Sequence, residues 1–121
     1  MKIEVLYLKG CHNHRLAVDQ VLQVLRVNGV DASVEEWEVA DSTMAQELRF
    51  LGSPSIRIDG LDVEPEARGV RSFGFGFRTY SDSEGWRSGL PEIGLIQRAV
   101  LEASVSDPSS GGGPGLDRED E

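Results

Sequence analysis

The residues best suited to chemistry lie in one short stretch, Gly10-Cys11-His12-Asn13-His14, which holds the only cysteine and both histidines of the 121-residue chain. A cysteine thiolate is a nucleophile toward disulfides and soft electrophiles. Thiolate and imidazole groups together are also ligands for zinc, copper or mercury. A lone cysteine is just as commonly a small buried apolar residue. The stretch therefore leaves three interpretations open: a reactive thiol, a metal site or a structural cysteine.

The elements around this stretch favour the reactive thiol. Residues 2–8 (KIEVLYL) form a strand-like apolar run, and residues 14–28 place apolar side chains on one helical face before the stop signal Asn28-Gly29. Cys11 is then expected at a helix amino terminus, where unpaired N–H groups and the helix dipole favour the thiolate. His14, about one turn further on, could add a positive charge or a hydrogen bond.

The rest of the chain predicts a single α/β domain. After the first helix the pattern indicates a strand at 32–39 and a short helix at 43–50, with Asp41 or Ser42 capping that helix. Next come a hairpin through Asp59-Gly60, a loop-rich segment at 64–90 and a final amphipathic helix at 91–103. The predicted order is β-α-β-α-β-β-loop-α. The aromatic residues of the loop-rich segment suggest either a lid over Cys11 or packing at a sheet edge: Phe73, Phe75, Phe77 and Tyr80.

Composition and charge limit the classes of partner. The chain is 39% hydrophobic and 27% charged, and it has no apolar run approaching the roughly 20 residues of a membrane helix. Its net charge of −9 opposes binding to nucleic acid or to an anionic membrane. A single cysteine fits a reducing compartment, so we expect a cytoplasmic protein. We expect a domain over residues 1–103 and a disordered Gly/Ser/acidic tail over 104–121, which carries −4 of the charge.

Three features together resemble the thioredoxin-like superfamily: Cys11 between the first strand and the first helix, Ser53-Pro54-Ser55 before the third strand, and the hairpin that follows. Residues 10–14 and the string at 49–65 (RFLGSPSIRIDGLDVEP) are also similar to short bacterial thioredoxin-fold proteins, some of them labelled alkylmercury lyase-like. The resemblance implies that Cys11 carries the chemistry, that His14 tunes it, and that Pro54 is cis and shapes the site. A cis proline would let the neighbouring backbone align an extended thiol substrate by strand-like hydrogen bonds.

The chain departs from the resemblance at two positions. The second cysteine of a Cys-x-x-Cys motif would fall where His14 stands, and the mercury-labelled relatives are expected to carry a cysteine near Phe77. With one thiol, the expected function is monothiol redox or thiol transfer, with a small thiol or a protein disulfide as partner. The alternative is a protein that binds mercury or copper, or an alkylmercury lyase-like protein without lyase activity.

The two alternative functions need further groups. Cys11 and His14 are the best-placed pair of metal ligands, but a closed zinc site needs about four. A lyase would also need an acid, for which Asp19, Asp59 and Asp62 are candidates. No phosphate-binding loop motif stands in a strand-turn-helix context, and no cofactor is expected.

Overall fold

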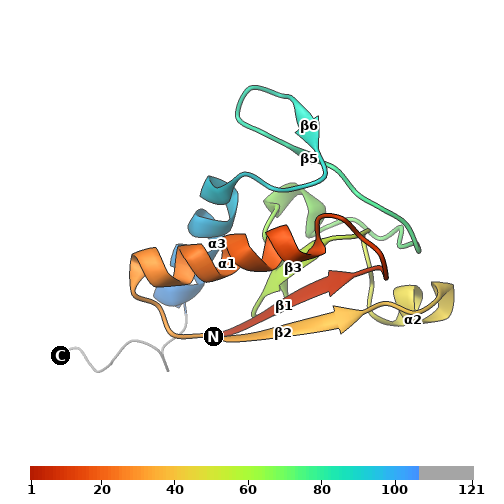
Figure 1. The fold of residues 1–121 in the computed structure, drawn as a ribbon, viewed down its shortest axis with the longest axis horizontal. Helices are drawn as coiled ribbons and strands as arrows, with labels where there is room; N and C mark the ends of the chain where they lie inside the picture. Colours follow the sequence, from red (N-terminus) through yellow and green to blue (C-terminus); the bar gives the residue numbers. More distant parts are fainter. Residues whose placement is uncertain (107–121) are drawn as a thin grey trace.

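Strand β1 (Lys2–Tyr7) lies at the centre of the sheet because its side chains are apolar on both faces. The computed structural model describes residues 1–106 and has a mixed four-stranded sheet and three α-helices (Figure 1). The sheet order is β2-β1-β3-β4, formed by β2 (Ser33–Glu38), β3 (Ser55–Ile58) and β4 (Leu61–Asp62). Strand β1 is parallel to β2 and antiparallel to β3, and β4 is antiparallel to β3. The predicted mixed α/β class is therefore correct.

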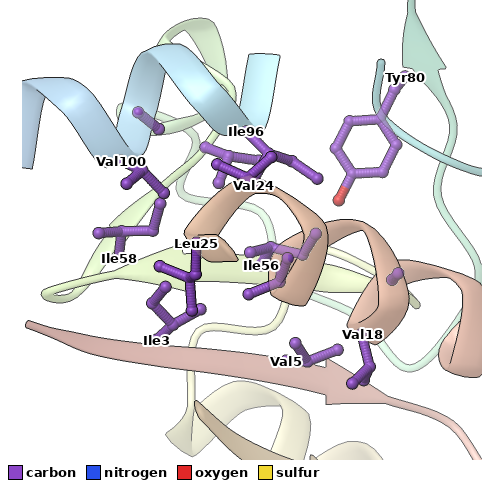
Figure 2. Packing of buried hydrophobic residues seen from close by; sticks show 14 residues of the cluster. Ile3, Val5, Val18, Val24, Leu25, Ile56, Ile58, Tyr80, Ile96 and Val100 are labelled. Atoms are coloured by element: carbon purple, nitrogen blue, oxygen red, sulfur yellow. The ribbon is translucent and has the colours of Figure 1, made fainter. Parts of the chain in front are cut away.

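One face of the sheet is covered by helices α1 (His14–Asn28) and α3 (Ile93–Ser106). Figure 2 shows Val24 and Leu25 of α1 packing with Ile96 of α3 over the isoleucines of β1 and β3. Each fully buried aliphatic side chain of this kind contributes about 1.5–3 kcal/mol. The opposite face holds a smaller cluster around Leu6 and Phe50, covered by α2 (Ser42–Glu47). Burial on both faces explains the nearly continuous apolar run of β1.

Several local signals act as the sequence predicted. Helix α1 ends at Gly29, which has a left-handed φ of 62°. Asp41 is the N-cap of α2, and its side chain accepts a hydrogen bond of 2.8 Å from the Met44 N–H. Asp59 and Gly60 both have positive φ, 50° and 86°, which is the type I′ geometry of a two-residue hairpin turn. These residues confirm the predicted end of α1, the cap and the β3–β4 hairpin.

Other boundaries differ from the prediction. Helix α2 ends at Glu47, before the predicted residue 50, whereas α3 continues to Ser106, past the predicted end at 103. Residues 104–106 contain neither glycine nor proline, so nothing there stops the helix. Residues 107–121 of the predicted tail lie outside the described part of the chain.

None of the helices described has the length and apolar character that a membrane crossing requires.

The segment predicted as loop contains short regular elements. A 3₁₀ turn, η1 (Pro65–Ala67), follows β4, and strands β5 (Tyr80–Ser81) and β6 (Arg87–Ser88) form a small hairpin that projects away from the main sheet (Figure 1). Strands of two residues are too short for an alternating pattern, which explains why the sequence predicted a loop.

Gly52, which precedes β3, lies close against this segment. Its φ is +119°, and a Cβ atom built on it would lie 2.6 Å from Arg78 Cβ and 3.0 Å from Arg78 N. A side chain at position 52 would therefore push the segment away from the residues that precede β3.

We predict that Gly52→Ala lowers the free energy of unfolding by at least about 1–3 kcal/mol, because backbone strain and a steric clash add together. The matched control is Gly60→Ala, which has a φ of +86° and no atom within 4 Å of its built Cβ. Urea denaturation of both variants measures the difference. Equal losses would contradict the close packing at Gly52.

Candidate functional site

Cys11 lies in the turn between β1 and α1 and is partly exposed. Its N–H donates to the Leu8 carbonyl at 3.0 Å, and its carbonyl accepts from the His14 N–H at 3.3 Å. Helix α1 begins at His14, with Asn13 at the N-cap position. Cys11 is therefore in the turn that leads into the helix and not, as the sequence suggested, in the helix start itself.

The segment before β3 is joined to the end of β1 by one buried side chain. The Ser53 hydroxyl accepts a hydrogen bond of 2.9 Å from the Leu8 N–H, and Ser53 is 2% exposed. The next peptide bond, Ser53–Pro54, is cis, and Pro54 is fully buried. Ser53 thus joins the segment that carries Pro54 to Leu8, where the turn of Cys11 begins, and the cis bond is the one that the resemblance implied.

The main chain at Ser53 is already paired. Its N–H donates to the Gly76 carbonyl at 2.8 Å, and its carbonyl accepts from the Arg78 N–H at 3.1 Å, forming a parallel bridge between Ser53 and Phe77. An extended substrate would need these same groups for strand-like pairing. The expectation that the backbone beside Pro54 aligns such a substrate is therefore wrong for this arrangement of the chain.

His14 makes its contacts with the sheet. Its ring stacks on Tyr7 with centroids 3.5 Å apart, and its Nε2 lies 2.6 Å from Glu36 Oε1 on β2. Within residues 1–106, the bond found between His14 and Cys11 is the main-chain bond from the His14 N–H to the Cys11 carbonyl, and no side-chain hydrogen bond joins the His14 ring to Cys11. The structure thus gives His14 a carboxylate partner that the sequence did not indicate, and its tuning of Cys11 stays a prediction.

The candidates for metal binding and acid catalysis are dispersed. Across residues 1–106, no group of three or more His, Cys, Asp and Glu residues is arranged to hold a metal ion. Asp19 lies 3.9 Å from Arg15, and Asp59 Oδ1 accepts from the Lys2 N–H at 2.8 Å. Asp62 pairs with an arginine in the network described next. None of these contacts places a carboxylate at Cys11.

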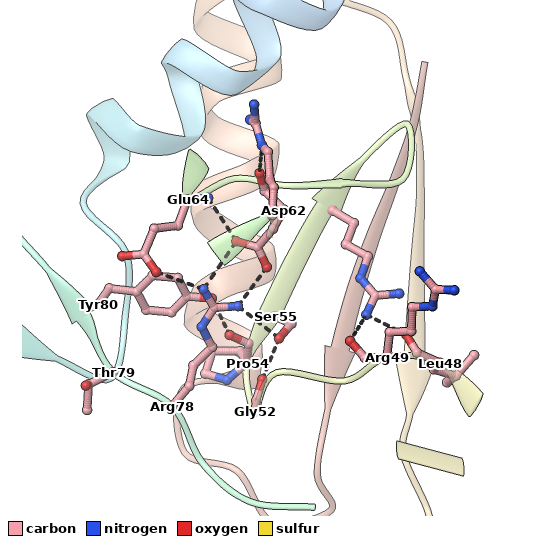
Figure 3. Close-up of polar contacts among 12 residues, drawn as sticks. Leu48, Arg49, Gly52, Pro54, Ser55, Asp62, Glu64, Arg78, Thr79 and Tyr80 are labelled. Carbon is pink, nitrogen blue, oxygen red and sulfur yellow. Dashed lines mark hydrogen bonds and ion pairs between the residues drawn. The ribbon is translucent and has the colours of Figure 1, made fainter. Parts of the chain in front are cut away.

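Sequence reasoning missed a buried polar network behind Pro54, centred on Arg78 (Figure 3). Its Nη1 and Nη2 donate to the two oxygens of Asp62 at 2.7 and 3.2 Å, and Nη2 also donates to Glu64 at 3.1 Å. The side chains of Arg78 and Asp62 are only 7% and 5% exposed. Nη1 also donates to the Ser55 hydroxyl at 3.2 Å. The network therefore fixes the start of β3 from the side opposite Ser53.

Tyr80 completes this network. The Arg78 guanidinium lies 4.2 Å from the centre of the Tyr80 ring, and the Tyr80 hydroxyl donates to the Pro54 carbonyl at 2.5 Å. Burial raises the pKa of the Tyr80 phenol. Burial alone would lower the pKa of Arg78, but the bonds and charges of its partners outweigh this and raise it. Both groups are held in the form that hydrogen-bonds best: a cation and a neutral phenol.

The aromatic residues of the loop-rich segment separate into two groups. Tyr80 belongs to the core, whereas Phe75 and Phe77 are 48% and 69% exposed. The main chain at Phe77 adjoins Ser53, so the position where relatives are expected to carry a cysteine lies beside the Pro54 segment. Among the described residues, Phe75 and Phe77 belong to neither buried hydrophobic cluster.

Comparisons of the chain with models of known families, with curated proteins and with solved structures find no match.

We predict that Asp62→Ala lowers the free energy of unfolding by about 3–5 kcal/mol, because it leaves the buried Arg78 charge without its main partner. Asp19→Ala is the control, since it breaks an exposed pair and should change stability by less than about 1 kcal/mol. Chemical denaturation followed by tryptophan fluorescence measures both. Similar losses in the two variants would show that the ion pair does not hold the fold.

The raised pKa of Tyr80 leads us to predict a loss of stability at alkaline pH. Its pKa is raised above the ordinary 10.0, so above pH 10 the unfolded chain releases a proton that the folded chain keeps, and the free energy of unfolding falls. Tyr80→Phe removes this contribution and also the bond to Pro54. The stability difference between wild type and Tyr80→Phe should therefore be larger at pH 8 than at pH 11. A constant difference in urea titrations would contradict the prediction.

Proposed function

We propose that the chain is a thioredoxin-like protein in which Cys11 acts as a thiol nucleophile in monothiol redox or thiol-transfer chemistry. The topology supports this: a parallel pair, β1 and β2, is joined through α1, and the β3–β4 hairpin extends the same sheet. Helix α3 returns to the face that α1 covers. This is the arrangement expected of a thioredoxin-like domain.

The observation that carries the proposal is the bond between Ser53 Oγ and Leu8 N at 2.9 Å. It brings the Pro54 segment to the turn of the sole cysteine, although the two are far apart in sequence. In the thioredoxin template the reactive cysteine and the proline before the third strand lie side by side. Cys11 is also a partly exposed residue, which supports access by a dissolved reagent.

The chemistry follows from the single thiol. The Cys11 thiolate attacks one sulfur of a disulfide, a new S–S bond forms, and the other sulfur leaves as a thiolate with the electron pair. Because His14 occupies the position of a resolving cysteine, an external thiol must attack the mixed disulfide and release Cys11. The reaction is therefore an exchange between two external thiols that passes through Cys11.

The paired main chain at Ser53 favours small partners. An extended protein substrate finds the N–H and carbonyl of Ser53 bonded to Gly76 and Arg78, and the carbonyl of Pro54 bonded to Tyr80. A small thiol such as glutathione does not depend on strand pairing. We therefore place a small thiol ahead of a protein disulfide as the partner.

Soft-metal binding is the alternative use of the same residue. Cys11 would hold mercury or copper as a thiolate ligand, with His14 as the second candidate ligand. His14 Nε2 faces Glu36, so this histidine would have to bind through its other ring nitrogen or leave its partner. Lyase turnover on an organomercurial would need a second thiolate, and we do not propose it.

The proposal predicts that oxidised glutathione adds one glutathionyl group to wild type and none to Cys11→Ser, and that reduced glutathione removes it. We also expect folded Cys11 to react with iodoacetamide at pH 7 at least about tenfold faster than the same cysteine in the urea-unfolded chain. Mass spectrometry measures both. Equal rates in the folded and unfolded chain would remove the case for an activated thiol.

Calorimetry with mercury or copper distinguishes soft-metal binding from thiol exchange. Tight binding by wild type that is lost in Cys11→Ser, together with no exchange of glutathione, would assign Cys11 to metal capture. Equal binding by both proteins would exclude a site centred on the cysteine.

A further inference from the structure

A second feature, away from the Cys11 turn, is a pocket of about 220 Å³ beside the β3–β4 hairpin. Four arginines line it: Arg49 after α2, Arg57 on β3, and Arg68 and Arg71 after η1. Its only acidic lining residue is Asp62, whose two carboxylate oxygens already accept from Arg78. The pocket is therefore strongly positive in a chain whose net charge is −9.

Two of the four guanidinium groups are fixed by main-chain carbonyls. Arg57 Nη2 donates to the carbonyls of Leu48 and Arg49 at 2.6 and 2.7 Å. Arg68 Nε donates to the Asp62 carbonyl at 2.7 Å, and its Nη2 is 3.7 Å from Glu102. The carbonyls hold Arg57 in place without neutralising it, whereas Arg68 also has the Glu102 carboxylate nearby. Arg57 and Arg68 are thus positioned before any ligand arrives.

The other two arginines have no carboxylate partner in the part of the chain that the structure describes. The ion pairs of residues 1–106 include neither Arg49 nor Arg71. Arg49 also has a positive φ of 55° directly after α2, a position where glycine is the favoured residue. An arginine there costs stability, so helix termination does not explain its presence.

Like charges crowd this pocket. Burial lowers the pKa of Arg57; Glu4 and Asp62 oppose that shift, whereas Arg78 and Arg49 add to it. A bound anion would relieve the repulsion among the guanidinium groups. Guanidinium groups donate in a planar fork that matches the oxygens of a phosphoryl group, and several of them favour a dianion over a monoanion.

We propose that this pocket binds a small phosphate, either inorganic phosphate or the phosphoryl group of a monophosphate ester. Its volume lies below the roughly 300–1,000 Å³ of pockets for drug-sized ligands, which fits a small anion. Arg57 and Arg68 form the fixed base of the site, and Arg49 and Arg71 supply the charges without partners. The site is independent of Cys11.

Titration of the full chain with inorganic phosphate at constant ionic strength, followed by calorimetry, tests the proposal. Wild type should bind one equivalent, and Arg49→Gly and Arg71→Gln should each weaken binding at least tenfold. Glycine suits the backbone at position 49, so Arg49→Gly should unfold at the same temperature as wild type or higher. The control is Arg15→Gln, which removes the same charge from a side chain 66% exposed on α1 and should bind within twofold of wild type.

A second titration, with glycerol phosphate, separates the two sources of the phosphoryl group. Binding more than tenfold tighter than phosphate assigns the pocket to an organic phosphate, and equal or weaker binding assigns it to the free ion. The proposal is overturned if wild type shows no saturable binding of either compound. It is also overturned if Arg15→Gln weakens binding as much as the pocket variants do, because the effect is then general screening.

Discussion

The buried ion pair between Arg78 and Asp62 is the interaction on which the rest of the site depends. A charge taken out of water is tolerated only with close partners, and Arg78 has Asp62, Glu64 and the hydroxyl of Ser55. These partners belong to β3, to β4 and to the second residue after β4, whereas Arg78 belongs to the segment that crosses Gly52. One guanidinium therefore joins a long connecting segment to the edge of the sheet.

Ser53 connects the segment of Arg78 to the turn that contains Cys11. Its main chain bonds to Gly76 and Arg78, and its hydroxyl bonds to Leu8 at the end of β1. The turn that contains Cys11 begins at Leu8. Leu8 is bonded to Ser53, whose position is fixed by its hydrogen bonds to three residues: Leu8, Gly76 and Arg78. The same bonds use the groups that an extended substrate would need. The fixed position of Ser53 and the proposed preference for a small partner thus have one cause.

Signals within a few residues of one another predicted much of the fold, and contacts distant in sequence produced the rest. Gly29, Asp41 and the Asp59-Gly60 turn act through their own backbone or near neighbours, so the sequence located the end of α1, the cap and the hairpin. The contacts of the Arg78 network join residues that are far apart in the sequence, so no periodic pattern of residues predicted them. The side chain of His14 meets Glu36 across the parallel pairing of β1 with β2, a contact that no spacing along the chain specifies.

Asp62 links the Arg78 network to the arginine pocket. Ser55 and Arg57 lie on the same face of β3, because they are two residues apart. Ser55 accepts a hydrogen bond from Arg78, and Arg57 lines the arginine pocket. Asp62 on β4 lies opposite Arg57 on β3 in the strand register. Its carboxylate accepts hydrogen bonds from Arg78, and its main-chain carbonyl accepts one from Arg68. Both of its carboxylate oxygens accept from Arg78 and its charge also acts on Arg57, whereas Arg68 donates only to its main-chain carbonyl. This division leaves the pocket positive although an aspartate lines it.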